Sequence, residues 1–472
     1  MSEAKTRIEE ATGAQPAAWT ERPPVAVVDL GKTNAKLLVF TPDGRIAHQT
    51  QSKPEWLQQE ELRVLDEPAL WAWMIGAIGD ALDRFAVERV IVTTHGCTFA
   101  LIGGGALAAP ILDYEQAPPP EIEEAFAAVS PPFAETFSPP LPVGFNLAKH
   151  LFWLGERDPD LLKRTQAIVC YPQYWTWRLS GEAVSEVSYL GCHTHLWSPV
   201  KDDFSSLVDA RDWREKMPPL VRAGAEAGYH SLITPAGAEA TLVVHNGVHD
   251  SNAALYFYRS VGYSDFTLVS TGTWVIVFNT DCPLGALDPA RDMLANVSVD
   301  REPVSTARFM GGREFDLISE ESRADVSLAL IERVIAKGLF ALPSFAPGGP
   351  FPGRAGATVG PEPSAEERRA LALLYVACMT HHVLGLVRSR NTIIVDGGLA
   401  RSRLYGGMLA ALRPGQTILG AEHAEGTAAG AAALAYEAIG LRPFEDPCRP
   451  IEPVAIEGLD DYYRRWLDMT ER

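Results

Sequence analysis

Short apolar runs separated by a polar, glycine-containing turn open the chain. Residues 25–29 (VAVVD) and 35–40 (AKLLVF) are rich in aliphatic and β-branched side chains, and the turn 31–34 lies between them. Asp43-Gly44 precedes a third such run that begins at Ile46, and Asp-Gly is typical of a tight hairpin turn. The pattern predicts a meander of three antiparallel strands at the start of the chain.

A helix and further strands are expected next. Apolar residues recur at helical spacing across residues 67–85, and the β-rich run 89–93 follows and ends at Thr94-His95-Gly96. This order predicts a helix that is followed by a strand. Further along, residues 241–245 predict another strand, 246–250 a polar turn, and the residues after them a helix.

The opening pattern returns half a chain later. Residues 266–280 (FTLVSTGTWVIVFNT) again consist of an apolar run, a glycine turn and a second apolar run. The two hairpins have the same order of elements but different sequences. An internal repeat of this kind indicates two similar domains, and we place them at residues 23–253 and 254–472.

The composition is that of a globular protein and narrows the expected partners. Of the 472 residues, 47% are apolar, which is enough to bury a substantial core. The net charge is −19, with 60 acidic against 41 basic residues, so neither nucleic acid nor an anionic membrane is an expected partner. No cysteine pair has C-x-x-C spacing, and neither a membrane-spanning run nor a signal peptide is evident. We therefore expect a cytoplasmic protein with reduced thiols.

An acid ends the first predicted strand, directly before the glycine turn. Asp29 in this position can hold Mg²⁺ directly or through water, while the turn offers backbone N–H groups, a hydroxyl and an amide to phosphate oxygens. The alternative is a plain hairpin in which Asp29 caps the turn. The segment is not a Walker motif. The candidates for phosphate contacts are Gly31, Lys32, Thr33, Asn34 and Lys36.

Two further motifs offer hydroxyls and a carboxylate. Thr271, Gly272 and Thr273 lie in the repeated hairpin, where hydroxyls beside a glycine suit hydrogen bonds to phosphate; a tight turn without a ligand is the alternative. His249-Asp250-Ser251 lies between a predicted strand and a predicted helix. Asp250 is either the N-cap of that helix or a general base that takes the proton of a substrate hydroxyl.

Glycines and histidines supply the remaining candidates. Asp396-Gly397-Gly398 follows a predicted strand, and a glycine turn there lets a flat ring or a ribose approach the backbone. Residues 425–431 (EGTAAGA) predict a helix of small residues, for which close helix packing is the simplest interpretation. His193 and His195 look like a metal pair, but no cluster with matching ligand spacing accompanies them.

In order and spacing, these motifs resemble those of the FGGY family of carbohydrate kinases, which belongs to the actin-like ATPase superfamily. The resemblance covers nearly the whole chain. Residues 29–36 and 270–274 are similar to the two phosphate motifs of the family, 249–251 to its catalytic motif, 397–402 to its adenosine motif, and 425–431 to its late small-residue stretch.

The resemblance implies an α/β fold of two RNase H-like domains with an interdomain cleft, ATP bound mainly by the second domain, and Mg²⁺ held with help from Asp29. Asp250 would be the catalytic base. The sugar contacts implied are His95, Gly96, His249 and Asp250; the nucleotide contacts are the phosphate candidates above with Gly397, Gly398, Arg401 and Ser402. The chain departs from the family where Leu399 replaces a third glycine and Gln173 an aspartate.

The motifs together predict an ATP-dependent kinase that phosphorylates a hydroxyl of a small sugar. Ser-Thr-Gly-Thr-Trp and the His-Asp pair resemble most the corresponding motifs of rhamnulose and fuculose kinases, and this resemblance implies a ketose or 6-deoxyketose such as rhamnulose or fuculose. Two alternatives share the fold: an actin- or chaperone-like ATPase without a sugar pocket, and an inactive sugar sensor, which would be expected to lack Asp250. The sugar is the expected partner, and a homodimer is a candidate assembly.

Overall fold

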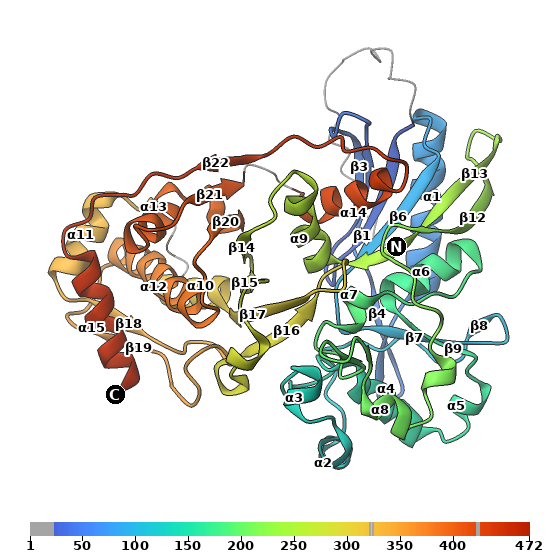
Figure 1. Cartoon of the computed structure of the whole chain (residues 1–472), viewed down its shortest axis with the longest axis horizontal. Helices are drawn as coiled ribbons and strands as arrows, with labels where there is room; N and C mark the ends of the chain where they lie inside the picture. Colours follow the sequence, from blue (N-terminus) through green and yellow to red (C-terminus); the bar gives the residue numbers. More distant parts are fainter. Residues whose placement is uncertain (1–22, 321, 323–324, 422–424) are drawn as a thin grey trace. The chain divides into compact units, whose positions relative to one another are not determined.

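Two compact units make up the chain (Figure 1). The computed structural model describes residues 23–320, 322, 325–421 and 425–472. Of the described residues, the first unit contains those up to Gly262 with the segments Asn296–Glu302 and Glu425–Asp446, and the second contains those in Tyr263–Ala295, Pro303–Ala424 and Pro447–Arg472. The chain thus passes into the second unit a few residues after the expected position 253, and two later segments return to the first unit.

A six-stranded sheet forms the centre of the first unit, in the order β12-β13-β6-β1-β2-β3. β1 pairs antiparallel with β2 and parallel with β6, and β6 pairs parallel with β13. The predicted meander is confirmed in β1, β2 and β3. The strands are β1 (Val25–Leu30), β2 (Ala35–Phe40), β3 (Ile46–Ser52), β6 (Arg89–Thr94), β12 (Glu226–Ile233) and β13 (Glu239–His249).

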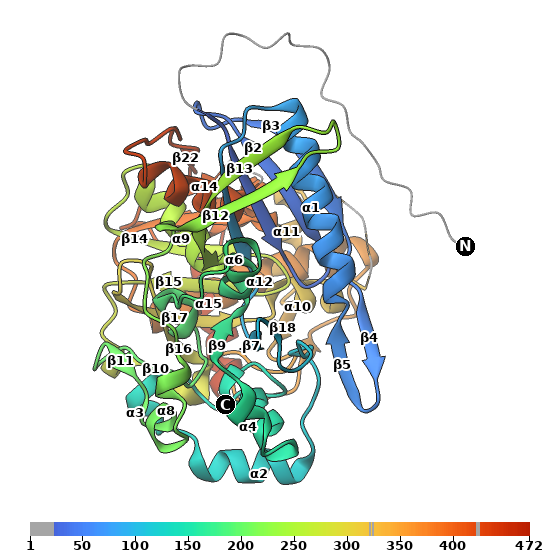
Figure 2. The ribbon, with the colours of Figure 1, turned by 90° about the vertical axis from the view of Figure 1, so that its right-hand side faces the viewer.

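Helices cover this sheet. α1 (Glu67–Arg84) begins at Asp66, whose side chain accepts a hydrogen bond from the Ala69 N–H, and it lies along strands β1 to β3 (Figure 2). α14 (Gly426–Glu437) contacts β1 and β6 and also packs against α9 (Asp250–Ser260). A Cβ on Gly430 would lie 1.9 Å from the Ala253 carbonyl oxygen, so glycine permits this close approach. The packing role expected for the small-residue helix is therefore confirmed.

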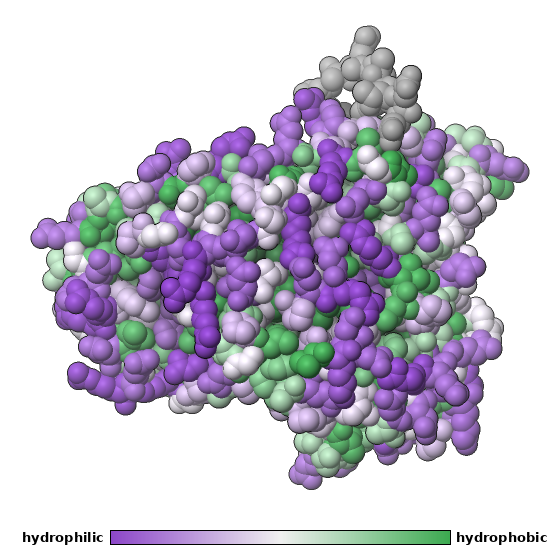
Figure 3. Space-filling model, in the orientation of Figure 1, coloured by the Kyte–Doolittle hydropathy of each residue, from purple (hydrophilic) through white to green (hydrophobic). Residues whose placement is uncertain are grey.

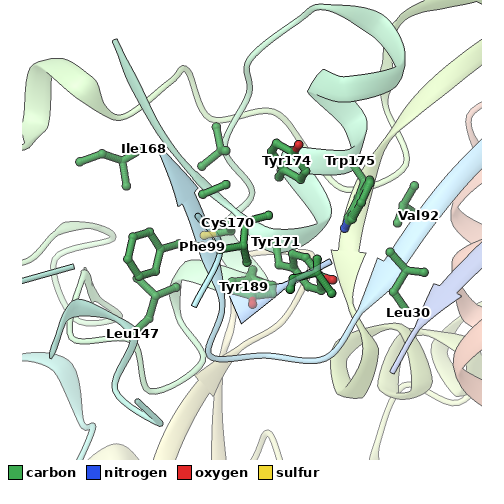
Figure 4. Close-up of a cluster of buried hydrophobic side chains, with 14 of the residues drawn as sticks. Leu30, Val92, Phe99, Leu147, Ile168, Cys170, Tyr171, Tyr174, Trp175 and Tyr189 are labelled. Carbon is green, nitrogen blue, oxygen red and sulfur yellow. The ribbon is translucent and has the colours of Figure 1, made fainter. Parts of the chain in front are cut away.

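An aromatic core joins the sheet to the rest of the first unit. Tyr171 and Trp175, from α6 (Tyr171–Ser180), pack with Leu30 and Val92 at the strand ends (Figure 4). The other elements of the unit are β4 (Trp56–Gln59), β5 (Leu62–Leu65), β7 (Phe99–Gly103), β8 (Ala106–Leu107), β9 (Ala167–Cys170), β10 (Trp197–Ser198), β11 (Asp203–Phe204), α2 (Pro120–Val129), α3 (Phe133–Thr136), α4 (Leu147–Arg157), α5 (Leu161–Arg164), α7 (Val187–Leu190) and α8 (Ser206–Ala210).

The polar turn expected at 246–250 is wrong, because β13 continues to His249 and the helix begins at Asp250. The register of β13 against β6 shifts between His245 and Val248, so the polar residues form a bulge inside the strand. Buried Gln173 supports this bulge: its amide donates to Asn246 Oδ1 at 3.0 Å and to the Gly247 carbonyl at 2.9 Å.

The second unit repeats the plan around a seven-stranded sheet, in the order β16-β17-β15-β14-β20-β21-β22. β14 pairs antiparallel with β15 and parallel with β20, as β1 does with β2 and β6. The predicted internal repeat is confirmed. The strands are β14 (Phe266–Thr271), β15 (Val275–Asn279), β16 (Met293–Val297), β17 (Pro303–Phe309), β20 (Thr392–Gly397), β21 (Ile418–Ala421) and β22 (Cys448–Pro450).

One helix of the described chain, α12 (Ala365–Leu386), is long and apolar enough to cross a membrane, yet 78% of its most apolar window is buried in the protein. It packs with α10, α11 and α13 as a core helix. The face drawn in Figure 3 is largely hydrophilic, with hydrophobic residues in scattered groups. The other elements are α10 (Gly311–Ser319), α11 (Leu328–Ala336), α13 (Arg403–Leu412), α15 (Leu459–Glu471), β18 (Phe340–Leu342) and β19 (Ala357–Val359).

Candidate functional site

The sheet of the first unit brings three predicted motifs to one edge. β1, β6 and β13 are parallel, so their carboxyl ends meet at the same edge, where ligands commonly bind in α/β folds. Leu30 aligns with Thr94, and Thr94 aligns with His249. The His95 N–H donates to the Leu30 carbonyl at 3.1 Å. Asp29, His95 and Asp250 therefore lie on neighbouring strand ends, although they are far apart in the sequence.

Asp250 is the first residue of α9, and no described residue is a partner of one of its carboxylate oxygens. Its Oδ1 accepts hydrogen bonds from the Ser251 N–H at 2.6 Å and the Ser251 hydroxyl at 3.2 Å. No described residue hydrogen-bonds Oδ2, and the side chain is 33% exposed. His249, not Asp250, occupies the N-cap position. The geometry therefore leaves a carboxylate oxygen free to accept a proton.

His249 is buried beside Asp250, with both ring nitrogens occupied. Its Nδ1 accepts from the Asn252 amide at 3.1 Å, and its Nε2 lies 3.2 Å from Asp250 Oδ1 and 3.7 Å from Cys192 Sγ. A Cβ on Gly96 would lie 2.9 Å from Nε2, so Gly96 makes room for the ring. Burial lowers the pKa of His249, against the pull of Asp250. These contacts give Gly96 and His249 structural roles within the protein. Their expected contacts with sugar stay predictions.

His95 presents a buried nitrogen that accepts no hydrogen bond from the described part of the chain. Its Nδ1 lies 2.8 Å from the Gly96 carbonyl, so Nδ1 carries the proton and Nε2 is an acceptor. No described residue hydrogen-bonds Nε2. Desolvation lowers the pKa of His95 to about 4, which keeps the ring neutral at pH 7. The rings of Tyr114 and Tyr171 lie 5.1 and 5.0 Å from it, centroid to centroid.

Asp29 lies in a concentration of negative charge. Burial, then the carboxylates of Asp250 and Glu425, raise its pKa to about 7, while Lys36 opposes them. Lys36 Nζ binds both carboxylate oxygens of Glu425 at 2.8 Å. The Asp29 carboxylate is thus raised in energy by like charges, which a divalent cation bound at Asp29 would relieve. The sequence did not predict a role for Glu425, because its partner Lys36 lies near the opposite end of the chain.

The turn predicted to contact phosphate at residues 31–34 is closed by its own backbone. The Gly31 N–H donates to the Asn34 carbonyl at 2.9 Å, and the Thr33 side chain is exposed. Asn34 Nδ2 lies 3.4 Å from Gln51 Oε1. Lys32 points elsewhere, because its ammonium forms an ion pair with Asp113. Contacts between this turn and a phosphate stay predictions, and Lys32 has another partner.

In the second unit, Thr271 joins two predicted nucleotide motifs. Its hydroxyl donates to the Asp396 carbonyl at 2.6 Å and accepts from the Leu399 N–H at 3.0 Å. Gly397 has a φ of +88°, and a Cβ there would lie 2.0 Å from the Thr271 carbonyl oxygen, so glycine is required. Leu399 makes this contact through its backbone N–H. Its side chain takes no part in the contact, which explains why leucine can stand there in place of glycine.

The hairpin turn meets a glycine pair that sequence reasoning missed. Gly272 and Thr273 are exposed, and the Gly312 N–H donates to the Thr273 carbonyl at 3.2 Å. A Cβ on Gly312 would lie 2.2 Å from the Gly272 carbonyl oxygen. Gly311-Gly312 lies at a strand-to-helix junction, as Gly397-Gly398 does, and this shared pattern was a signal that could have identified it.

The other predicted residues differ in how far the structure explains them. Ser402 is the N-cap of α13 and accepts from the Tyr405 N–H at 3.3 Å, and Arg401 and Gly398 are exposed. His193 Nδ1 lies 2.8 Å from the Phe145 carbonyl oxygen, and His195 is buried. Within the described ranges, no group of three or more His, Cys, Asp or Glu side chains is arranged to hold a metal ion.

Comparison with known proteins identifies the family. Residues 263–443 match the model of the carbohydrate kinase FGGY C-terminal domain. A crystal structure of a carbohydrate kinase from Novosphingobium aromaticivorans is 33% identical, with a TM-score of 0.85 over 95% of this chain and 98% of that one. The chain belongs to the FGGY family of carbohydrate kinases. The predicted family and its two-domain, actin-like α/β fold are confirmed.

Other relatives of this FGGY chain are more distant. The L-fuculokinase of Escherichia coli (strain K12) is 25% identical over 276 residues, which cover 54% of this chain and 56% of that protein. The match thus spans little more than half the length of this curated relative. The xylulose kinase structure from Rhodospirillum rubrum is 17% identical, with a TM-score of 0.74 over 95% of this chain and 97% of that one, and supports the fold alone.

Proposed function

We propose that this FGGY chain transfers the terminal phosphoryl group of ATP to a hydroxyl of a small sugar, with Asp250 as the base. The observation that carries the proposal is the free Oδ2 of Asp250 at the sheet edge that also holds the unpartnered Nε2 of His95. A hydroxyl must lose its proton as it attacks phosphorus, and a carboxylate without a partner can accept that proton.

His95 would fix the sugar. A buried acceptor without a partner is costly, and a sugar hydroxyl that donates to Nε2 would remove that cost. The surrounding tyrosine rings offer apolar surface beside this polar atom. A site with one acceptor and two rings suits a sugar that has both hydroxyls and an apolar edge, and a 6-deoxyketose is such a sugar. We therefore keep rhamnulose and fuculose as the first substrates to test, with the distant fuculokinase relative as further support.

ATP and Mg²⁺ are the proposed cofactors. The exposed turn at Gly272 and Thr273 would contact the phosphates, and Asp29 would hold the metal, largely through water or phosphate oxygens because no fuller ligand set surrounds it in the described residues. When bound, Mg²⁺ neutralises charge on the transferred group. Lys36 is paired with Glu425 and would place its ammonium near Asp29 and the bound phosphates.

A panel of ketoses, aldoses and polyols in a coupled ADP assay tests the activity, and His95 variants test the sugar site. His95→Ala should weaken sugar binding by about tenfold, because the sugar hydroxyl would lose the acceptor that Nε2 provides, and it should leave ATP binding nearly unchanged. His95→Gln retains an acceptor near the position of Nε2 and should recover part of the affinity. Calorimetry measures the two ligands separately. Unchanged sugar affinity in folded His95→Ala would remove this residue from the site.

The alternative is an ATPase that uses the same fold without a sugar. It would release ADP at a rate that no sugar increases. Stimulation of ADP release by one class of sugar therefore separates the two functions.

A further inference from the structure

The ammonium of Lys32 is enclosed by charge and aromatic rings. Its Nζ forms an ion pair with Asp113 and lies 3.7 Å from Glu115 Oε2. It also lies 3.8 Å from the centre of the Trp56 ring and 4.9 Å from that of Tyr114. Both distances are within the range of cation–π attraction. The side chain is only 14% exposed, so these contacts occupy the charge that was expected to meet a phosphate.

Asp113 is a fixed anchor for this ammonium. Its side chain is fully buried, and its Oδ1 also accepts from the Glu115 N–H at 2.9 Å. Its backbone N–H donates to the Arg63 carbonyl at 2.8 Å, and Arg63 Nε lies 3.2 Å from Oδ2. These contacts hold the Asp113 carboxylate in place, so it could move with the Lys32 ammonium only if the segment beside β5 also moved.

Tyr114 connects this anchor to the sheet edge. It follows Asp113 in the chain, its carbonyl accepts from the Gly144 N–H at 2.8 Å, and its ring lies 5.1 Å from His95 and 5.6 Å from Phe145. No described residue hydrogen-bonds its hydroxyl. The same ring thus lies near both Lys32 and the proposed sugar ligand His95.

We propose that Lys32 and Asp113 act as a strut that positions Tyr114 as a wall of the sugar site, and that Lys32 is not a phosphate ligand. This inference rests on the proposed sugar-kinase function. Lys32 acts through Tyr114 and is a positioning residue. Its loss is therefore felt in the affinity for sugar, while the affinity for nucleotide is unchanged.

Calorimetry on the full chain tests the strut. Lys32→Met alone would take the ammonium away from buried Asp113 and leave Arg63 as its charged partner. The main variant is therefore Lys32→Met with Asp113→Asn, which removes both charges and keeps both shapes. L-Fuculose, L-rhamnulose and D-xylulose are titrated as sugars, and Mg²⁺ with a non-hydrolysable ATP analogue as nucleotide. The double variant should bind its best sugar about tenfold more weakly, in the range of coupled neighbours, and the nucleotide within about twofold of wild type.

A Tyr114→Ala background shows whether the effect passes through the ring. Tyr114→Ala should itself weaken sugar binding, and adding the double variant should weaken it no further, because the strut has nothing left to position. Additive losses would overturn the inference, as would weaker nucleotide binding with unchanged sugar affinity. Wild-type protein that binds none of the three sugars would count against the proposed function, whereas wild-type binding that the variants leave unchanged would overturn the strut alone.

Discussion

Asp29→Asn should stabilise the first unit at high pH, because the native carboxylate is held in an unfavourable place. Burial and the neighbouring carboxylates raise the pKa of Asp29 from 3.8 to about 7. The folded chain therefore keeps the proton to higher pH than the unfolded chain does. Between about pH 4 and pH 7 the unfolded chain binds fewer protons, so this group makes stability fall as pH rises.

The magnitude follows from that shift. Each unit of pKa corresponds to about 1.4 kcal/mol. The cost to stability is therefore at most about 4 kcal/mol at pH 8, where folded Asp29 is ionised, and about 2 kcal/mol at pH 5, where the folded chain holds a proton that the unfolded chain has lost. Asparagine has the same shape and no charge. The free energy of unfolding of Asp29→Asn relative to wild type should thus grow by about 2–3 kcal/mol from pH 5 to pH 8. Contacts that the asparagine amide gains or loses equally at pH 5 and pH 8 do not affect this change with pH, because they cancel when the two values are subtracted.

Urea unfolding followed by tryptophan fluorescence measures this change in the first unit, whose core holds Trp175, Trp197 and Trp213. The experiment is run without metal or nucleotide. Asp43→Asn is the matched control: a hydrogen bond from Thr41 lowers the pKa of exposed Asp43, so its removal should give no gain at high pH. A stability difference for Asp29→Asn that is flat between pH 5 and pH 8 would refute the charge repulsion from which the metal site is argued.

Two predictions concern the turn at Gly272 and Thr273, which is proposed to contact ATP. Thr273→Val exchanges an exposed hydroxyl for a methyl and should raise KM for ATP about threefold to tenfold, the worth of one hydrogen bond, with KM for sugar unchanged; unaltered ATP kinetics would make the turn structural only. Gly312→Ala places a Cβ 2.2 Å from the Gly272 carbonyl oxygen and should cost about 1–3 kcal/mol and weaken ATP binding. Gly415→Ala, where a Cβ meets nothing within 4 Å, is its control in urea unfolding, and equal stability of the two would contradict the crowding.

The sequence predicted most where its information is local. The runs around 31–34 and 270–274 carry strand, turn and strand in order, and both hairpins are present in the structure. A cluster of polar residues does not by itself show whether the chain turns or bulges there. The segment 246–250, expected to be a turn, instead contains a bulge in β13 that buried Gln173 supports. Its stabilising contacts come from a distant helix, which local pattern cannot supply.

The same limit applies to the candidate site. Asp29, His95 and Asp250 could be proposed singly, because each follows a strand at a motif that resembles the family. Their shared edge follows only from the parallel pairing of β1, β6 and β13. Lys32 with Asp113, and Lys36 with Glu425, are long-range pairs that neither spacing nor periodicity predicts. For that reason, the role proposed here for Lys32 differs from the phosphate contact that the sequence predicted.

The most direct test of the account is sugar-dependent ADP formation by wild-type protein and by Asp250→Asn. With ATP, Mg²⁺ and its best sugar, the wild-type protein should form ADP at a rate that depends on the sugar. Asp250→Asn should lower kcat by about 10²–10⁴-fold, the usual cost of losing a general base, and bind the sugar with little change. ADP formation that no sugar increases, or near-normal turnover by folded Asp250→Asn, would contradict the proposal that Asp250 serves a sugar kinase.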